Sequence, residues 1–241
     1  MKSLCLTLLF AAGAAIVSAA PKAFDAVILP YKEVVVSSPV QSSITAIFVK
    51  EGDVVTLGQP LAQLYNKMEE LDMNRTKAAL EKKEFDFKGS KNLYADKIIS
   101  EDEALKNRIE LELAKLQFDM ASEVHHQREI VAPIAGIVVE KLREVGEAVQ
   151  ASQPMFRLVD ISRVYVQFYV RAEDLAALKV GDEMDVRCPV VDPTGTFVGK
   201  VDFIDPRVDA ASGLMRVKVI LPNADGRIKA GLRAEVSRHA E

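Results

Sequence analysis

Residues 49–64 read VKEGDVVTLGQPLAQL, and residues 143–158 read REVGEAVQASQPMFRL, which is the same pattern displaced by 94 positions. The displacement aligns, in order, Pro39, Gly52, Pro60 and Leu64 with Pro133, Gly146, Pro154 and Leu158. The chain therefore contains the two halves of one small β-module, separated by an insertion.

Each half reads as short β-segments punctuated by turn residues. Gly52 and Gly146 stand where a tight turn needs a positive φ, and each Gln-Pro pair marks an extended entry into the next strand. Because neither half could close a sheet core alone, we expect residues 24–66 and 128–160 to face each other as a flattened β-sandwich. The expected strands are 33–36, 43–49 and 61–64 in one half, and 130–131, 137–142 and 155–159 in the other.

The insertion, residues 67–127, has the composition of helices: it lacks proline, contains one glycine and is dense in Lys and Glu. Ser100, with Glu103 three residues later, forms a capping-box pattern that starts a second helix. We therefore expect antiparallel helices at about 67–96 and 101–127, a hairpin that reaches about 40 Å at 1.5 Å per residue.

Apolar residues follow more than one line along this hairpin. On the second helix, one line has coiled-coil spacing and is predicted to bury against the first helix: Leu105, Ile109, Leu113, Leu116 and Met120. A further line is predicted to pack against a neighbouring subunit, because it would otherwise be exposed: Phe87, Tyr94, Leu111 and Phe118. The alternative is one broad, imperfect seam within an isolated hairpin.

From residue 161 to residue 241 the pattern is that of short strands separated by turns. A short helix is expected at 172–178. Several short strands with one helix predict a small β-barrel, to which the strand around Ala26–Leu29 could contribute. The expected strands are 164–170, 183–186, 197–204, 214–221 and 234–237.

Composition narrows the class of protein further. The chain has 241 residues, 49% of them apolar, and a net charge of −4, which gives no electrostatic footprint for nucleic acid. Residues 1–19 have the charged start, short apolar run and small-residue end of a secretory signal peptide. Removal of that segment would leave Cys188 as the single cysteine, expected to be a buried thiol.

Enzymatic chemistry finds little support in the sequence. The three histidines include the adjacent pair His125 and His126, but no nearby residues complete a metal-ligand set. Phosphate-binding glycine loops and nucleophile-elbow serines are not visible. We therefore predict no catalytic residue, no metal site and no cofactor.

Together, the split module, the hairpin and the barrel resemble the periplasmic adaptor subunits, or membrane fusion proteins, of the HlyD-like family, over residues 24–241. The segment 132–138 with Val145-Gly146-Glu147 looks like the family's second lipoyl half-motif. Residues 205–231 are similar to its barrel signature, although Ala230 stands where a proline is usual. The resemblance implies a mainly β chain: a split lipoyl/biotinyl-like β-sandwich, an inserted antiparallel coiled-coil hairpin and a small β-barrel.

The family's role implies an adaptor in an RND-type tripartite efflux pump. Such a subunit lies in the periplasm and links an inner-membrane transporter to an outer-membrane channel of the TolC type. Copies assemble as a hexamer in the pump, and none performs catalysis.

The resemblance also implies that the hairpin tip docks on the channel, through Leu93, Lys97, Ile98, Ile99 and Ser100. Many members carry an Arg, Leu, Ser triplet there. Leu93 and Ser100 match it, but Gly89 occupies the arginine position, with Lys88 and Lys91 beside it. N-capping alone would also explain Ser100.

Larger family members continue into a membrane-proximal domain, for which we expect too few residues here. The main alternative is an adaptor for an ABC-type exporter, whose adaptors often retain an N-terminal membrane helix. A biotin or lipoyl carrier would present its modified lysine at the junction of the two halves, which the helical insertion occupies. A free periplasmic binding protein would be a monomer with a ligand pocket.

Overall fold

The computed structural model describes residues 23–171, 173 and 178–239. It consists of two compact units, one built from residues 29–164 and 222–230, the other from the remaining described segments. The predicted signal peptide and most of the predicted helix at 172–178 lie outside the described residues. Within these residues, no helix combines the length and apolar character needed to cross a membrane.

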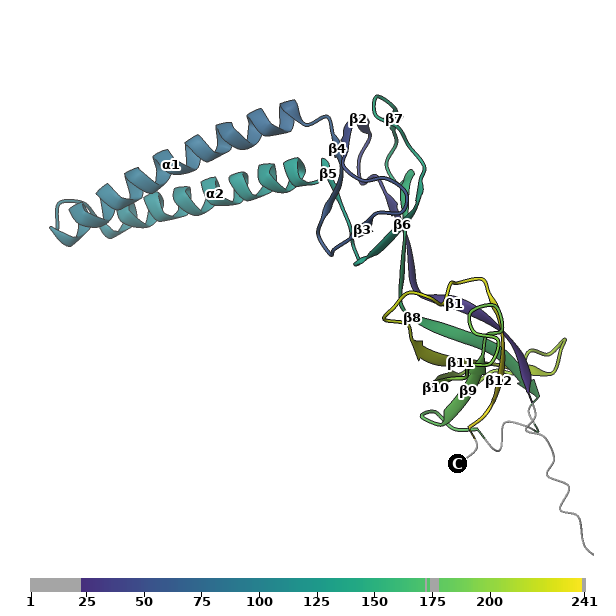
Figure 1. Cartoon of the computed structure of the whole chain (residues 1–241). Helices are drawn as coiled ribbons and strands as arrows, with labels where there is room; N and C mark the ends of the chain where they lie inside the picture. The colour runs from purple at the N-terminus through teal and green to yellow at the C-terminus, as the bar shows by residue number, and fades with distance from the viewer. Residues whose placement is uncertain (1–22, 172, 174–177, 240–241) are drawn as a thin grey trace, which may run out of the picture. The chain divides into compact units, whose positions relative to one another are not determined.

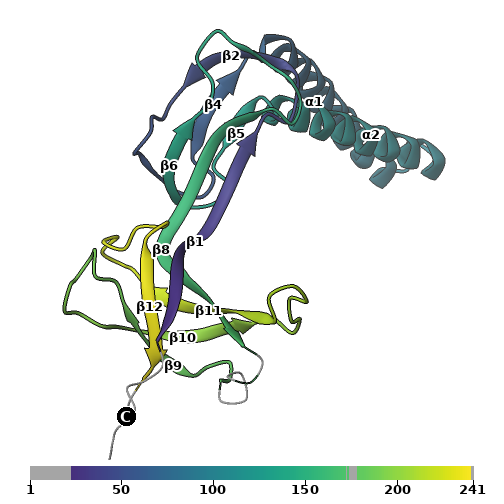
Figure 2. The ribbon, with the colours of Figure 1, turned by 90° about the vertical axis from the view of Figure 1, so that its right-hand side faces the viewer.

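One unit is a barrel of antiparallel strands (Figure 2). Its strands are β9 (Glu183–Arg187), β10 (Phe197–Ile204), β11 (Leu214–Pro222) and β12 (Arg233–Arg238), together with the start of β1 (Phe24–Ser37) and the end of β8 (Pro154–Arg171). The rest of β1 and β8 belongs to the other unit. The order β1-β12-β9-β10-β11-β8 closes into a cycle, because β1 and β8 also pair. Ala26 lies opposite Ala234, so the strand around Ala26 contributes to this unit as predicted. Cys188 is fully buried, which confirms the expected thiol environment.

Residues 205–231, which are similar to the family's barrel signature, contain side-chain hydrogen bonds that close the turns between strands. Asp205 is 7% exposed and accepts hydrogen bonds from the Arg207 backbone and guanidinium and from Arg216. Hydrogen bonds from Arg207 hold the pKa of Asp205 below its ordinary value. Asp209 accepts from the Ser212 backbone and hydroxyl, which closes the next turn. These residues therefore shape the loops between strands.

The other unit contains the predicted β-sandwich. One sheet has the order β5-β4-β2-β7, and facing it are β8, β6 and β3. The new strands are β2 (Ser42–Ile47), β3 (Val54–Val55), β4 (Pro60–Leu64), β5 (Glu129–Val131), β6 (Gly136–Lys141) and β7 (Ala148–Val149). Both halves supply the core between the sheets, which includes Ile44, Leu61, Leu64, Val138, Phe156 and Leu158.

The duplication read from the sequence is reproduced bond by bond. The Gly52 N–H donates to the Val138 carbonyl at 2.8 Å, and 94 residues later the Gly146 N–H donates to the Ile44 carbonyl at 2.9 Å. Both glycines adopt the predicted positive φ, 92° and 93°. A residue with a side chain would be strained at either turn, which explains why glycine stands at both.

The helices α1 (Lys67–Ala95) and α2 (Glu101–His126) follow β4 and precede β5 (Figure 1). Because β4 and β5 are paired neighbours, the hairpin starts and ends at adjacent strands. A salt bridge of 2.6 Å joins Glu69 of α1 to Arg128, whose side chains are only 17% and 16% exposed. The predicted fold class, mainly β with an inserted helical hairpin, is confirmed.

Candidate docking site on the helical hairpin

The seam between α1 and α2 follows an alternating spacing of three and four residues, typical of a coiled coil. Its α1 side is half-buried or buried and comprises Met73, Thr76, Leu80, Lys83, Phe87 and Ser90. Its α2 side comprises Ala104, Asn107, Leu111, Ala114, Phe118 and Ala121. Among the described hairpin residues, the buried ones are small: Ser90, Ala114 and Ala121. Small side chains let the two helices approach closely.

Polar contacts across the seam set the register of the two helices. Lys83 Nζ lies 2.6 Å from Glu110 Oε2, and Asn107 Nδ2 donates to Ser90 Oγ at 3.3 Å. Hydrogen bonding to Lys83 holds the pKa of Glu110 below its ordinary value of 4.5. The same bond holds the pKa of Lys83 above 10.5. Because a shift along either helix would break these pairs, they favour one alignment.

The predicted seam on α2 is wrong. Leu105, Ile109, Leu113, Leu116 and Met120 are 41–70% exposed. Leu105, Ile109, Leu113 and Leu116 lie on the face of α2 turned away from α1, since the seam residues occupy the opposite side of the helix. Met120 instead lines a hollow between the helices, together with Met68 and Thr76 of α1. The largest apolar side chains of α2 predict the wrong face. The regular heptad that begins at Ala104 was the better signal, although it mixes alanine and asparagine with leucine and phenylalanine.

Of the four residues predicted to pack against a neighbouring subunit, three lie on the seam within the hairpin and one is exposed. Phe87, Leu111 and Phe118 are half-buried and lie on the seam within the hairpin. Tyr94 is 45% exposed near the end of α1. Subunit packing stays a prediction, and the large apolar side chains left exposed for it on α1 are Met68, Leu71, Phe85 and Leu93.

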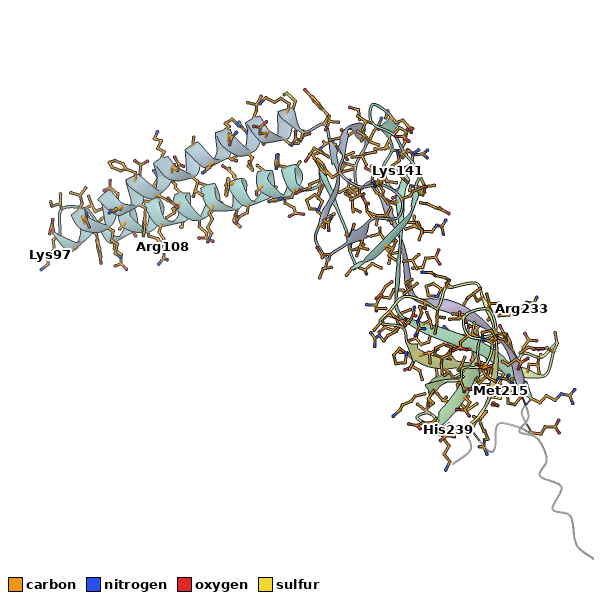
Figure 3. All side chains as sticks on the ribbon, viewed as in Figure 1. Lys97, Arg108, Lys141, Met215, Arg233 and His239 are labelled. Carbon is orange, nitrogen blue, oxygen red and sulfur yellow. The ribbon has the colours of Figure 1, made fainter. Side chains whose placement is uncertain are left out.

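The tip of the hairpin ends α1 with a Schellman motif (Figure 3, Lys97 label). The Ile98 N–H donates to the Leu93 carbonyl at 2.8 Å, and the Lys97 N–H donates to the Tyr94 carbonyl at 2.9 Å. Lys97 has a φ of 59°, at the position where glycine is usual. Ile98 is 66% exposed and Leu93 is 42% exposed, which makes the turn apolar on the outside.

Ser100 begins α2 as predicted. Its Oγ accepts a hydrogen bond from the Glu103 N–H at 3.2 Å, so the capping function is confirmed. A hydroxyl that accepts in this way still carries its own proton as a donor. The predicted tip residues, including the half-buried Ile99, thus share one short turn. This turn can offer a partner an apolar contact and a hydrogen-bond donor.

Comparison with known proteins agrees with this architecture. A family model for CzcB-like, barrel-sandwich hybrid domains matches residues 32–160. The chain belongs to this CzcB-like family. A second model, for CusB-like, beta-barrel domains, matches residues 163–241. The resemblance to the periplasmic adaptor family is thereby confirmed.

Curated relatives in this family include the cation efflux system protein CzcB of an Alcaligenes species. It is 25% identical over 193 residues, which cover 76% of this chain and 37% of that protein. The nickel-cobalt-cadmium resistance protein NccB of Alcaligenes xylosoxydans is 25% identical over 246 residues, covering 96% of this chain and 60% of the relative. The chain therefore spans less than two thirds of the length of these relatives.

Solved structures of similar fold include a MacA–MexA chimeric protein with the MexA α-hairpin domain of Pseudomonas aeruginosa. Its TM-score is 0.77 at 20% identity, over 91% of this chain and 79% of the chimera. ZneB from Cupriavidus metallidurans has a TM-score of 0.55, also at 20% identity, over 91% of this chain and 98% of ZneB. These likenesses support the fold.

Proposed function

We propose that this protein is a periplasmic adaptor that links an inner-membrane RND transporter to an outer-membrane channel and so supports export. The observation that carries the proposal is the β-sandwich interrupted by a long hairpin with apolar residues exposed at its tip and along both helices. An apolar surface of this extent on a thin hairpin is costly in water unless partners cover it. The family's adaptor role supports the same function.

The contribution of the protein to export is geometric. The 29 residues of α1 span about 43 Å, at 1.5 Å per residue. The base of the hairpin is held at adjacent strands by the Glu69–Arg128 salt bridge and by the 3.2 Å contact between Asn66 Nδ2 and His125 Nε2. A hairpin held in this way carries a docking surface away from the sandwich that supports it.

The channel is proposed to dock at the tip, through Leu93, Ile98 and the Ser100 hydroxyl, with Lys97 and Ile99 in the same turn. Leu93→Asp should reduce capture of the channel and export, because a carboxylate would have to be desolvated in an apolar contact. Pull-down of the channel from cells and resistance assays measure the two effects.

Val190→Asp is the matched control for Leu93→Asp, since Val190 is an exposed valine of the barrel unit, 75% accessible. It should leave channel capture unchanged. Normal channel capture and export by a folded Leu93→Asp protein would contradict docking at the tip.

Homo-oligomerisation is part of the proposal, with a hexamer expected in the assembled pump. Light scattering and crosslinking of the protein in membranes that contain its transporter would test this. A strictly monomeric species that never associates with membrane components would favour the free binding protein instead.

Divalent metal cations are the proposed cargo class, because the relatives CzcB and NccB are named for cation efflux and for nickel, cobalt and cadmium resistance. Among the described residues, no group of three or more His, Cys, Asp or Glu could hold a metal ion. Cargo selection is therefore assigned to the transporter. Deletion of the gene should sensitise cells to these cations, and sensitivity to organic drugs alone would contradict the proposed class.

Two alternatives give different results in simple experiments. An ABC-type exporter as inner-membrane partner would appear directly in a pull-down of the tagged protein. A carrier function would require a biotin or lipoyl adduct, which an intact-mass measurement detects. The position for such an adduct, between β4 and β5, is occupied by the hairpin.

A further inference from the structure

The base of the hairpin contains an asparagine whose side chain is not used as its position favours. Asn66 stands at the N-cap of α1, where an asparagine side chain usually accepts a hydrogen bond from the first turn of the helix. Among the described residues, no backbone N–H donates to the Asn66 side chain in this way. Its Nδ2 atom lies 3.2 Å from Nε2 of His125, at the end of α2. Asn66 therefore joins the two helices across their base.

This contact determines the protonation state of His125. An amide nitrogen only donates hydrogen bonds, so Nε2 of the ring accepts, and the ring is neutral with its proton on Nδ1. Nδ1 is buried and has no hydrogen-bond partner within the described part of the chain. Buried polar atoms in proteins are nearly always hydrogen-bonded, so His125 occupies an exceptional site. A further proton would have to bind Nε2, where it would face the Asn66 amide.

The charged groups at the base leave this ring without a carboxylate partner. Arg128 has a side chain that is 16% exposed, and it donates to Glu69 of α1 at 2.6 Å. Lys67 and Glu70 pair with each other at 3.0 Å. The other titratable groups on the elements that meet here are Tyr65, Glu123, His126 and Glu129. Within the described residues, no ion pair joins His125 to any acidic side chain, so a positive charge on the ring would be uncompensated.

Protonation of His125 would remove a hydrogen bond and add a charge. The acceptor of the 3.2 Å contact with Asn66 would be lost, because Nε2 would then carry a proton. The new charge would also stand three residues from Arg128, whose carboxylate partner is already engaged. Histidine is the side chain that ordinarily changes its charge between pH 5 and 8. The contact is therefore present at neutral pH and weakened by acid.

Backbone hydrogen bonds connect this contact to the sandwich. The Leu64 N–H, at the end of β4, donates to the Arg128 carbonyl at 2.8 Å, and the Arg128 N–H donates to the His125 carbonyl at 3.0 Å. The Asn66 carbonyl accepts the first bond of α1, from the Glu70 N–H at 2.9 Å. Both partners of the contact thus belong to residues whose backbone holds a helix end. A change at the ring reaches the start of α1 and the end of α2 together.

We propose that His125 makes the joint between the hairpin and the sandwich sensitive to protons. The neutral ring holds the two helix ends together through Asn66, and the protonated ring releases them. This inference rests on the proposed adaptor function for its consequence, since a firm joint is what presents the tip of the hairpin to the channel. Acid should accordingly weaken channel capture through the base of the hairpin, with the tip itself unchanged.

Nuclear magnetic resonance of the imidazole nitrogens in the full chain tests the protonation state. At about pH 7.5, His125 should show the neutral ring with its proton on Nδ1. The variant His125→Gln assigns these signals, because it removes them. A ring that is already protonated at this pH, or that carries its proton on Nε2, would overturn the proposal.

Amide hydrogen exchange measures the joint itself, with each rate divided by that of an unstructured peptide at the same pH. Protection of the Glu70 and Gln127 amides should fall about fivefold between about pH 7.5 and about pH 5.5, the range in which carboxylates keep their charge. The Ala104 amide, which donates to Ser100 at the tip, is the internal reference and should not respond. Unchanged protection at the base, or higher protection in acid, would contradict the proposed joint.

Two substitutions at the contact should change the response in different ways. His125→Gln keeps a side chain that can pair with Asn66 at every pH, so protection at the base should no longer depend on pH. Asn66→Asp places a carboxylate opposite the ring, and because a carboxylate favours the protonated ring, acid should strengthen this joint. His126→Gln is the matched control, since His126 is exposed, and it should respond as wild type does. A wild-type response in His125→Gln, or an unreversed one in Asn66→Asp, would overturn the proposal.

Channel capture at the two pH values separates this inference from the proposed function. Capture by wild type should fall at about pH 5.5, whereas His125→Gln should capture the channel equally at both. A pH response of the base amides, in a protein whose gene deletion leaves export intact, would retain the joint and reject the adaptor role. Normal export and channel capture, without a pH response of the base amides, would retain the adaptor role and reject the joint.

Discussion

At the scale of single residues, a lysine occupies a position whose backbone favours glycine, and a glycine occupies a helical position that could accept a side chain. Lys97 has a positive φ of 59° in the turn between the helices, whereas Gly89 lies inside α1, where a side chain would meet nothing within 4 Å. Gly136 differs from both, because a Cβ there would lie 2.5 Å from the Val159 carbonyl oxygen. Each position therefore predicts whether a substitution raises or lowers the free energy of unfolding.

Lys97→Gly should raise the free energy of unfolding by about 1 kcal/mol, because glycine enters the left-handed region without the steric cost that a side chain incurs. Lys91→Gly, in the last turns of the same helix, should lower it by about 1 kcal/mol. Urea unfolding followed by circular dichroism at 222 nm measures both. Equal signs for the two substitutions would show that Lys97 is not strained.

Alanine substitutions at Gly136 and Gly89 should have opposite effects. Gly136→Ala is expected to cost about 1–3 kcal/mol, since the sheet must move to relieve the contact with Val159. Gly89→Ala should add about 1 kcal/mol, because alanine is the better helix former and the site is open. Thermal unfolding of both variants is the measurement, and a stabilised Gly136→Ala protein would be inconsistent with the close approach.

At the scale of elements, the hairpin holds its register through polar seam contacts and keeps its large apolar residues outside. The Lys83–Glu110 pair makes that register sensitive to pH. The pKa of Glu110 is lowered in the folded protein by hydrogen bonding to Lys83. The stabilisation is therefore present above the ordinary pKa of 4.5 and is lost as the pH falls through the lower folded value.

Glu110→Gln should accordingly lower the melting temperature of the helices at about pH 6, and the difference between wild type and variant should shrink as the pH falls below 4.5. Glu84→Gln, which removes an exposed carboxylate of α1, should not change the melting temperature at either pH. Melting curves at 222 nm across this range provide the readout. A difference between wild type and Glu110→Gln that persists unchanged below pH 4.5 would mean that the carboxylate contributes through packing.

Element boundaries could be read well from the sequence, and the reasons are local. Proline-free Lys/Glu composition identified the insertion, and the Ser100 cap located the start of α2. The 94-residue repeat, with glycine at each positive φ, predicted both halves of the sandwich. The β8 strand is longer than predicted because residues 160–163 continue it between two expected strands. The predicted seam on α2 was wrong. Both apolar lines on that helix have helical periodicity, so periodicity alone does not indicate which line faces α1.

At the scale of the whole molecule, Gly89 tests the proposed contact with the channel. The resemblance to the adaptor family implies that Leu93 and Ser100 stand for the leucine and serine of an Arg, Leu, Ser triplet, and Gly89 stands at the arginine position. Gly89→Arg should therefore strengthen channel capture in pull-downs, by adding a charged donor one turn of helix from Leu93.

Gly89→Ala separates helix propensity from the guanidinium group in this experiment. Both substitutions should stabilise α1 by similar amounts, since arginine and alanine are both good helix formers. Only the arginine should increase capture. An equal gain from alanine would assign the effect to helix stability, and no gain from either would place the channel contact away from this position.

The sequence by itself determined the split β-module, the inserted hairpin and its turns, because these depend on backbone conformations that glycine, proline and capping residues impose locally. Only the tertiary structure decided which line of each helix faces inward. Close approach of the helices favours small residues such as Ala114 and Ala121, and the Lys83–Glu110 pair sets their alignment. The large apolar side chains are consequently left on the outside, where the proposed function needs them.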